Sequence, residues 1–200
     1  MKLDHLVLFD FDGTLTTRDT LFEFCKFYAG EFKFAIGMLV LSPVLAAHRL
    51  RFITAHCTKE IFLSYFIGGI PSHEFEELCQ KFANHLKTLI RSKAMAEIEI
   101  YQRQNARMII VSASPENWII PWAKAYHIEV IATRLQVVGN KMTGKILGKN
   151  CNGVEKVNRI LQILDPSNYK QISAYGDTSG DLPMLGIAHH RFFKPFRGNN

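Results

Sequence analysis

Five short and mainly apolar runs constrain the fold of this 200-residue chain more than any other feature. They are Leu6–Phe9, Met108–Val111, Ile128–Ala132, Ile172–Tyr175 and the weaker Arg191–Phe193. Apolar runs of this length without strict alternation are typical of strands buried on both faces of a parallel sheet. Because helical patterns lie between them, the sequence predicts an α/β fold with a Rossmann-like parallel sheet.

Two of the helical patterns have clear boundaries. One begins near Ser114, which we expect to be the N-cap with Pro115 in the first helical position, and ends near Tyr126. The other covers 153–164 and carries its apolar residues on one face. Both helices follow an expected strand, as a doubly wound sheet requires.

Two stretches depart from the simple alternation of strands and helices. Strand-like runs at 135–138 and 141–147, separated by Gly139 and Asn140, predict a hairpin. Residues 17–90 are mainly helical and far longer than a crossover between parallel strands needs. We therefore predict a catalytic core formed by 1–16 and 91–200, with a helical cap inserted at 17–90.

Composition and charge exclude several classes of protein. Hydrophobic residues make up 48% and charged residues 21%, which is ordinary for a soluble domain. The net charge is +6, but the Lys and Arg residues are scattered, so we expect no nucleic-acid partner. The four cysteines form no CxxC pair, and acidic residues interrupt the first apolar run, which argues against a signal peptide. A cytoplasmic location is expected.

One segment qualifies that expectation. Phe34–Ala47 contains no charged residue over 14 positions, and Pro43 interrupts it. A spanning helix needs about 20 apolar residues, so we expect a buried or interfacial helix. Contact with a membrane surface is kept as the alternative.

The first cluster of chemically active residues follows the first expected strand. Asp10 and Asp12 stand two residues apart, with Gly13 after them. Two carboxylates about 4 Å apart repel by about 1 kcal/mol in water and more inside a protein, which a divalent cation relieves. Oxygen ligands favour magnesium over zinc.

Polar residues also end two later strands. Ser112 closes the second, and Asp177 follows the fourth with Asp181 one helical turn further on. Ligands of open α/β sheets bind at the carboxyl ends of the strands, so these side chains should meet Asp10 and Asp12.

These motifs resemble, in order, those of the haloacid dehalogenase (HAD) superfamily. The resemblance rests on DFDGT at 10–14, the serine at the end of the second strand, Lys156 near the start of a helix, and GDTSGD at 176–181. The insertion directly after DFDGT is similar to the cap of the phosphoserine-phosphatase-like branch, subfamily IB.

The resemblance implies a role for each matching residue. Asp10 is expected to be the nucleophile that forms an aspartyl-phosphate, and Asp12 the general acid and then base. Ser112 and Lys156 are expected to hold the phosphoryl group. Asp177, together with the Asp10 side chain and the Asp12 carbonyl, is expected to bind Mg²⁺, with Asp181 supporting this metal site.

Substrate selection is where the chain departs from the phosphoserine phosphatases. Asp19 takes the place of a glutamate that reads the substrate amino group, and Ala113 the place of a glycine in the pocket floor. Arg49 or Arg51 is the candidate for a cap arginine that reads a carboxylate.

The preferred function is a magnesium-dependent phosphomonoesterase acting on a small, phosphoserine-like organic phosphate. One alternative is a lipid-phosphate phosphatase, similar to the phosphatidylglycerophosphate phosphatases, at a membrane surface. The other is a non-catalytic module that binds only metal or phosphate.

Overall fold

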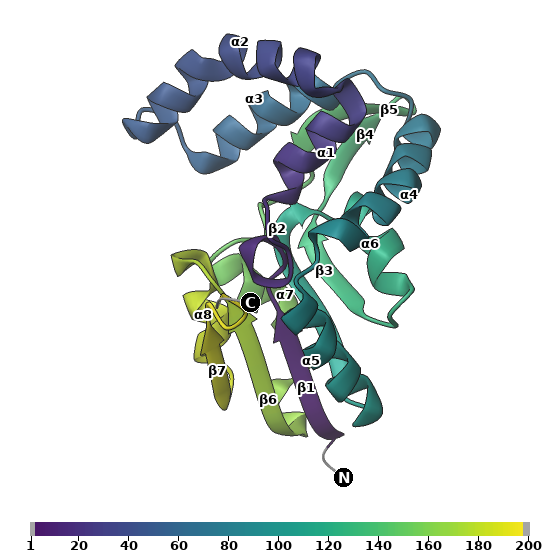
Figure 1. Ribbon diagram of the computed structural model, residues 1–200. Coiled ribbons are helices and arrows are strands. Elements are labelled where there is room, and N and C mark those ends of the chain that lie inside the picture. The colour runs from purple at the N-terminus through teal and green to yellow at the C-terminus, as the bar shows by residue number, and fades with distance from the viewer. Residues whose placement is uncertain (1–2, 198–200) are drawn as a thin grey trace.

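A five-stranded parallel sheet forms the centre of the protein (Figure 1). The computed structural model describes residues 3–197. The strand order is β3-β2-β1-β6-β7, and every pairing is parallel. The strands are β1 (Leu3–Phe9), β2 (Arg107–Pro115), β3 (Glu129–Thr133), β6 (Tyr169–Gly176) and β7 (His190–Phe193). All five expected strands and the α/β fold class are therefore confirmed, while 1–2 and 198–200 lie outside the described residues.

The helices that accompany the sheet are α5 (Ser92–Arg103), α6 (Glu116–Lys124), α7 (Val154–Ile163) and the short α8 (Leu182–Gly186). Helix α6 begins one residue later than expected, so Ser114 as N-cap is wrong. Strand β2 pairs with β3 as far as Pro115, whose extended backbone is incompatible with a first helical position. The Ser114 side chain instead lies close to Thr20.

Four helices fill the long insertion between β1 and β2. They are α1 (Thr20–Ala29), α2 (Glu31–Arg49), α3 (Ala55–Ile67) and α4 (Ser72–Leu89). Helix α2 continues through Pro43 instead of being broken there, so it is longer than the charge-free run suggested. Among the described residues, α2 is the one helix that is long and apolar enough to cross a membrane. Only 17% of its apolar window is buried inside the protein.

The expected hairpin is present as β4 (Leu135–Val138) and β5 (Lys141–Ile146). It packs against α3, where Ser64 Oγ donates a hydrogen bond to the Thr143 carbonyl at 3.1 Å. Gly144 makes this approach possible, since a Cβ there would lie 2.3 Å from the Ser64 backbone. The hairpin therefore accompanies the inserted helices in space (Figure 1). The division of the chain into core and cap at 16/17 and 90/91 stays a prediction.

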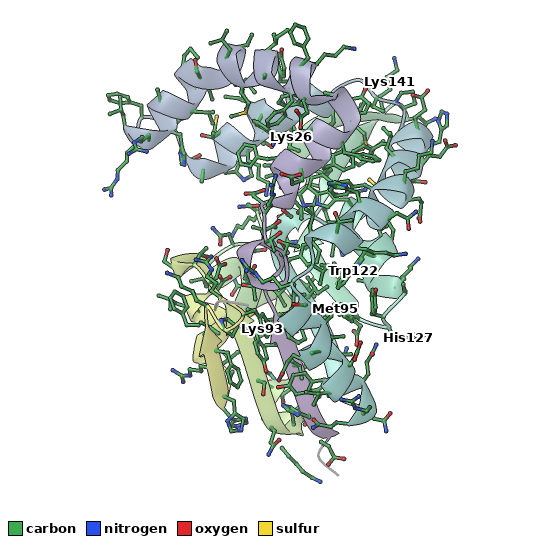
Figure 2. The ribbon with its side chains drawn as sticks, viewed as in Figure 1. Lys26, Lys93, Met95, Trp122, His127 and Lys141 are labelled. Carbon is green, nitrogen blue, oxygen red and sulfur yellow. The ribbon has the colours of Figure 1, made fainter. Side chains whose placement is uncertain are left out.

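Two clusters of buried side chains stabilise the two faces of the sheet. The larger one joins the sheet to α1–α6, and the smaller packs α7 and α8 against the opposite face. Trp118 and Trp122 are buried in the larger cluster, as the sequence predicted. Figure 2 shows Trp122 between the inserted helices and the lower part of the sheet. Because the same cluster continues from the sheet into α1, α3 and α4, the inserted helices are held over the carboxyl edge of the sheet.

Candidate active site

Asp10 occupies the first position after β1. Its backbone N–H donates to the Tyr175 carbonyl of β6 at 2.9 Å, which continues the sheet pairing. The carboxylate is buried: Oδ2 accepts from Thr14 Oγ1 at 3.0 Å, and Oδ1 accepts from Lys156 Nζ at 2.6 Å. Burial raises the pKa of Asp10 to about 7, although the charge of Lys156 opposes this shift.

Lys156 is the buried cation of the site. Its ammonium donates to Asp10 Oδ1 at 2.6 Å, to Asp181 Oδ1 at 2.6 Å and to the Val111 carbonyl at 2.7 Å. These three acceptors match the three N–H donors of the group. Burial alone would lower the pKa of Lys156, but Asp10 and Asp181 outweigh it and raise the pKa. The ammonium therefore stays charged.

Asp181 is held from both sides. One carboxylate oxygen bonds Lys156, and the other accepts from the N–H groups of Asp177 (3.1 Å) and Thr178 (2.9 Å) and from the Thr178 hydroxyl (2.8 Å). Burial would raise the pKa of Asp181, but Lys156 and the Thr178 hydrogen bonds lower it below its ordinary value. Asp181 is thus a fixed negative charge behind Lys156.

Asp10, Asp177 and Asp181 form a buried group of carboxylates. Each offers an oxygen, and these oxygens lie within 4.8 Å of one another. The φ angle of Gly13 is +78°, and a Cβ there would meet Asp177 Oδ2 at 2.6 Å. Gly13 therefore lets the backbone pass directly beside this carboxylate. Carboxylate oxygens gathered this closely are the kind of ligand that Mg²⁺ prefers.

Asp177 has two further partners. Its Oδ1 accepts from Thr14 Oγ1 at 3.4 Å, and its Oδ2 accepts from the guanidinium of Arg197. Burial raises the pKa of Asp177, while Arg197 opposes this shift. The C-terminal segment that carries Arg197 is anchored by Phe196, whose ring stacks on Tyr175 at 5.4 Å.

The Asp12 carboxylate points to the inserted helices and is not part of the group formed by Asp10, Asp177 and Asp181. Its Oδ1 accepts from both the N–H and the hydroxyl of Thr20, each at 2.6 Å, and its Oδ2 accepts from Ser112 Oγ at 3.4 Å. Thr20 is the first residue of α1, so the Asp12 carboxylate accepts its hydrogen bonds at the N-terminus of that helix. Trp118 donates to Thr20 Oγ1 at 3.1 Å and stacks on Phe24 at 4.7 Å. Sequence reasoning missed Thr20 and Trp118 as positioning residues for Asp12.

Asp10, Asp12, Lys156 and Asp181 line a cavity of about 200 Å³ between the sheet edge and the inserted helices. The cavity brings together six of the candidate site residues predicted from the sequence, whereas Ser112 and Asp177 are not among its lining residues. Its walls are formed by Asp10, Asp12, Asp19, Leu21, Lys59, Ala113, Ser114, Asn152, Lys156, Thr178 and Asp181.

Lys59 of α3 is the cation that the insertion contributes to this cavity. Its Nζ donates to the Ala113 carbonyl at 2.6 Å and to Asn150 Oδ1 at 3.3 Å, both of which are neutral acceptors. Burial lowers the pKa of Lys59 to about 8, although the negative charges of Asp12 and Asp19 act to raise it. No local motif marks Lys59, so only the packing of α3 reveals it.

Asp19 and the two candidate arginines have different positions. Asp19 is the N-cap of α1, where Oδ1 accepts from the Leu21 N–H at 2.9 Å. It is exposed at the mouth of the cavity, and desolvation by the surrounding walls together with Asp12 raises its pKa to about 6. Arg49 and Arg51 are exposed at the end of α2 and beyond it, and neither lines the cavity. The structure places Lys59 where an arginine was expected.

Ser112 lies within β2, three residues before the strand ends. Its Oγ accepts from the Ser114 N–H at 3.0 Å and donates to Asp12. The pairing of β2 with β3 is irregular between Ser112 and Pro115, so this stretch departs from the regular ladder. The Ser112 hydroxyl thereby lies beside the carboxylates at the sheet edge.

Residues 7–186 match the family model of the haloacid dehalogenase-like hydrolases. The chain belongs to this family. It is similar to protein CicA of Caulobacter vibrioides, with 35% identity over 196 residues that cover 96% of this chain and 87% of CicA. The matched segment contains DFDGT, Ser112, Lys156 and GDTSGD.

Solved structures share the fold at lower identity. A protein of unknown function from Bordetella pertussis Tohama I has a TM-score of 0.82 at 20% identity, covering 94% of this chain and 88% of that one. A substrate-bound phosphoserine phosphatase has a TM-score of 0.61 at 17% identity, covering 96% and 87%. The overall fold is therefore common to all three.

Proposed function

We propose that the protein is a magnesium-dependent phosphomonoesterase with Asp10 as its nucleophile. The observation that carries the proposal is the buried Lys156 ammonium, which bonds Asp10 and Asp181 at 2.6 Å beside a third carboxylate, Asp177. A buried ion pair at the edge of a cavity is costly to maintain and fits a role in charge stabilisation. Phosphoserine phosphatases among the proteins of similar fold support phosphoryl chemistry.

The reaction would proceed in two displacements. In the first, Asp10 attacks phosphorus, the bond between phosphorus and the ester oxygen breaks, and Asp12 gives its proton to the leaving alcohol. In the second, Asp12 takes a proton from water, the oxygen of that water attacks phosphorus, and the Asp10–phosphorus bond breaks. Inorganic phosphate leaves, and both carboxyl groups return to their starting states.

The remaining residues of the site would hold charge during these steps. Lys156 and Ser112 would hold phosphoryl oxygens, while Thr20 keeps Asp12 aimed at the leaving group. Asp10, Asp177 and the Asp12 carbonyl would hold Mg²⁺, and when bound the metal supplies neutralisation of phosphoryl charge. Because both oxygens of Asp181 already bond Lys156 and Thr178, we infer that Asp181 acts mainly through Lys156.

The substrate we propose is a small organic phosphate whose leaving group carries further charge. Asp19 and Lys59 both line the cavity and have opposite signs. An anionic group of the substrate would replace the neutral acceptors of Lys59, and a cationic group would pair with Asp19. A phosphoserine-like compound satisfies both.

Replacement of the nucleophile tests the proposal. Asp10→Asn is nearly isosteric and should lower kcat for p-nitrophenyl phosphate with Mg²⁺ by about three orders of magnitude or more. Asp4→Asn, an exposed aspartate on the same strand, is the matched control and should keep wild-type activity. Near wild-type turnover by folded Asp10→Asn would overturn the assignment. Absence of turnover in the wild type, with Mg²⁺ bound, would instead favour the non-catalytic metal-binding module.

A lipid-phosphate phosphatase is a second candidate, and the exposed apolar surface of α2 favours it. The two candidates differ in the substrate that is hydrolysed fastest. Comparison of kcat/KM for phosphoserine and for phosphatidylglycerophosphate in mixed micelles separates them.

A further inference from the structure

The outer face of α2 is apolar and uncovered in the described structure. Phe34, Gly37 and Leu41 form the buried stripe of the helix, and Gly37 packs directly against Phe66 of α3. The exposed face carries large apolar side chains instead of charged ones, with Phe32 79% and Leu39 74% exposed. Its large apolar members are Phe32, Ile36, Leu39 and Val40. The side chains of this helix project from the top of the molecule, with no other described element above them (Figure 2).

This pattern is unusual for a surface helix. A helix that packs on one side normally has a polar outer face, whereas α2 has no charged residue between 34 and 47. The apolar surface continues into the turn after α2, where Leu50 and Phe52 are exposed. Clustered apolar side chains of this size mark an interaction surface.

The charges around the apolar surface indicate its partner. From residue 31 to 52 the basic side chains are Lys33, Arg49 and Arg51, against the single acid Glu31. The cations stand at the two ends of the helix, so they border the apolar face without entering it. A second copy of this face would bring like charges together. An anionic lipid surface complements both the basic ends and the apolar middle.

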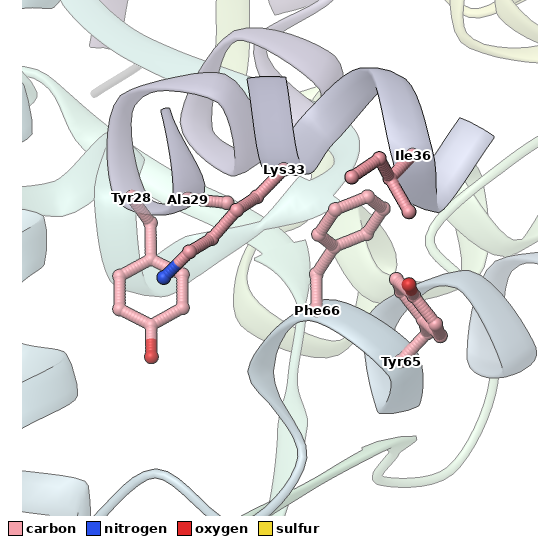
Figure 3. Close-up of a pocket in the computed structure, with 6 residues that line it drawn as sticks. All are labelled: Tyr28, Ala29, Lys33, Ile36, Tyr65 and Phe66. Atoms are coloured by element: carbon pink, nitrogen blue, oxygen red, sulfur yellow. The ribbon is translucent and has the colours of Figure 1, made fainter. Parts of the chain in front are cut away.

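A pocket of about 420 Å³ adjoins the same surface (Figure 3). Tyr28 and Lys33 lie on one side, and Ile36, Tyr65 and Phe66 on the other. Each tyrosine and the lysine combine an apolar body with a polar end, which is the character of side chains at the boundary of a bilayer. Side chains suited to a membrane boundary therefore continue from α2 onto α1 and α3.

We propose that α2 and the turn after it dock the protein on the surface of an anionic phospholipid bilayer. The helix lies in the plane of the interface, because the stripe of Phe34, Gly37 and Leu41 stays packed on its neighbours. Phe32, Leu39 and Phe52 enter the acyl boundary, and Lys33, Arg49 and Arg51 contact lipid phosphates. This docking is independent of which phosphate ester the site hydrolyses.

Co-sedimentation of the full-length protein with vesicles tests the docking. Wild type should bind phosphatidylcholine vesicles containing phosphatidylglycerol, bind pure phosphatidylcholine less, and lose affinity as salt is raised. The double variant Phe32→Ser, Leu39→Ser removes two side chains that are largely exposed. It should lower the partition coefficient by about tenfold or more. Lys33→Glu with Arg49→Glu should remove the preference for anionic vesicles.

The matched control is Leu161→Ser, Ile163→Ser, which removes two exposed apolar side chains from α7. It should bind vesicles as wild type does. Hydrolysis of p-nitrophenyl phosphate by each variant reports that the fold is intact. Three results would overturn the proposal: no binding of wild type to anionic vesicles, equal binding by the α2 variant, or a lipid-free dimer, seen by light scattering, that this variant dissociates.

Discussion

At the residue scale, the site depends on one buried ammonium shared between two carboxylates. The bonds from Lys156 to Asp10 and Asp181 are short and lie in a water-poor environment. Such a pair contributes little to stability relative to an apolar core, but removal of one member leaves the other charge unpaired. This asymmetry predicts a large effect for a single substitution.

Lys156→Met should lower the free energy of unfolding by about 3–5 kcal/mol at pH 8, as measured by urea denaturation. The pKa of Asp10 is already raised to about 7. Protonation can therefore relieve the unpaired charge, and the loss should be smaller at pH 5. Lys170→Met is the control, since Lys170 forms an exposed pair with Asp4 and should change stability by about 1 kcal/mol or less. A loss equal to that of the control would contradict the shared-ammonium interpretation.

Binding of an anionic substrate group by Lys59 should depend on pH. Burial lowers its pKa to about 8, so the ammonium is charged below that pH and neutral above it. For a phosphate ester with a second anionic group, KM should therefore rise as the pH increases through about 8. Lys59→Arg should abolish the rise because the guanidinium stays charged.

p-Nitrophenyl phosphate, which has no second anionic group, is the control substrate. Its KM should show no such rise with pH. Parallel rises for both substrates would show that Lys59 does not read the leaving group.

At the element scale, the close packing of α2 on α3 depends on a glycine. A Cβ at Gly37 would lie 2.4 Å from the Phe66 ring and 2.7 Å from the Tyr65 ring. A larger residue must therefore push the helices apart.

Gly37→Leu should lower the free energy of unfolding by about 1–3 kcal/mol through overpacking. Ala35→Leu, on the exposed side of the same helix, should change it by only about 0.5 kcal/mol. Thermal denaturation followed by circular dichroism gives both values. Equal effects of the two substitutions would mean that the α2–α3 contact is not close.

Helix α1 shows how an element orients a carboxylate of the site. Its first residue, Thr20, directs two donors at Asp12, and Trp118 of α6 fixes the Thr20 hydroxyl. The orientation of the Asp12 side chain thus depends on the N-terminus of an inserted helix, although Asp12 belongs to the first motif of the chain.

At the scale of the whole molecule, the cluster of three carboxylates joins two parts of the chain that are far apart in sequence. Asp10 follows β1, while Asp177 and Asp181 follow β6, the strand that pairs with it. Repulsion among these carboxylates opposes folding in the absence of a cation. A bound cation therefore stabilises the arrangement of the sheet edge.

Mg²⁺ should raise the melting temperature, because it binds the folded state. At a concentration about 100 times Kd the gain is about 2.7 kcal/mol, or about 5–10 °C for a chain of this size. Differential scanning fluorimetry before and after treatment with a chelator measures the shift. Asp177→Asn should reduce it strongly, whereas Asp165→Asn, at an exposed cap, should leave it unchanged. An unchanged shift in Asp177→Asn would exclude this residue as a ligand.

The sequence by itself predicted the sheet, the hairpin and the family. These features depend on local patterns: apolar runs specify buried strands, and DFDGT and GDTSGD place carboxylates directly after two of them. Neighbouring parallel strands bring their carboxyl ends together, so the sequence grouped Asp10, Asp12, Asp177 and Asp181. The structure gathers the side chains of all but Asp12, which bonds Thr20 instead.

Only the tertiary structure decided which groups the inserted helices contribute to the site. The sequence favoured Arg49 or Arg51 as the cation, but α3 places Lys59 in the cavity and leaves both arginines exposed. The reason is physical: a side chain of an insertion reaches the site through the packing of several elements, here α3 against the β4–β5 hairpin and α2. No spacing along the chain encodes that packing.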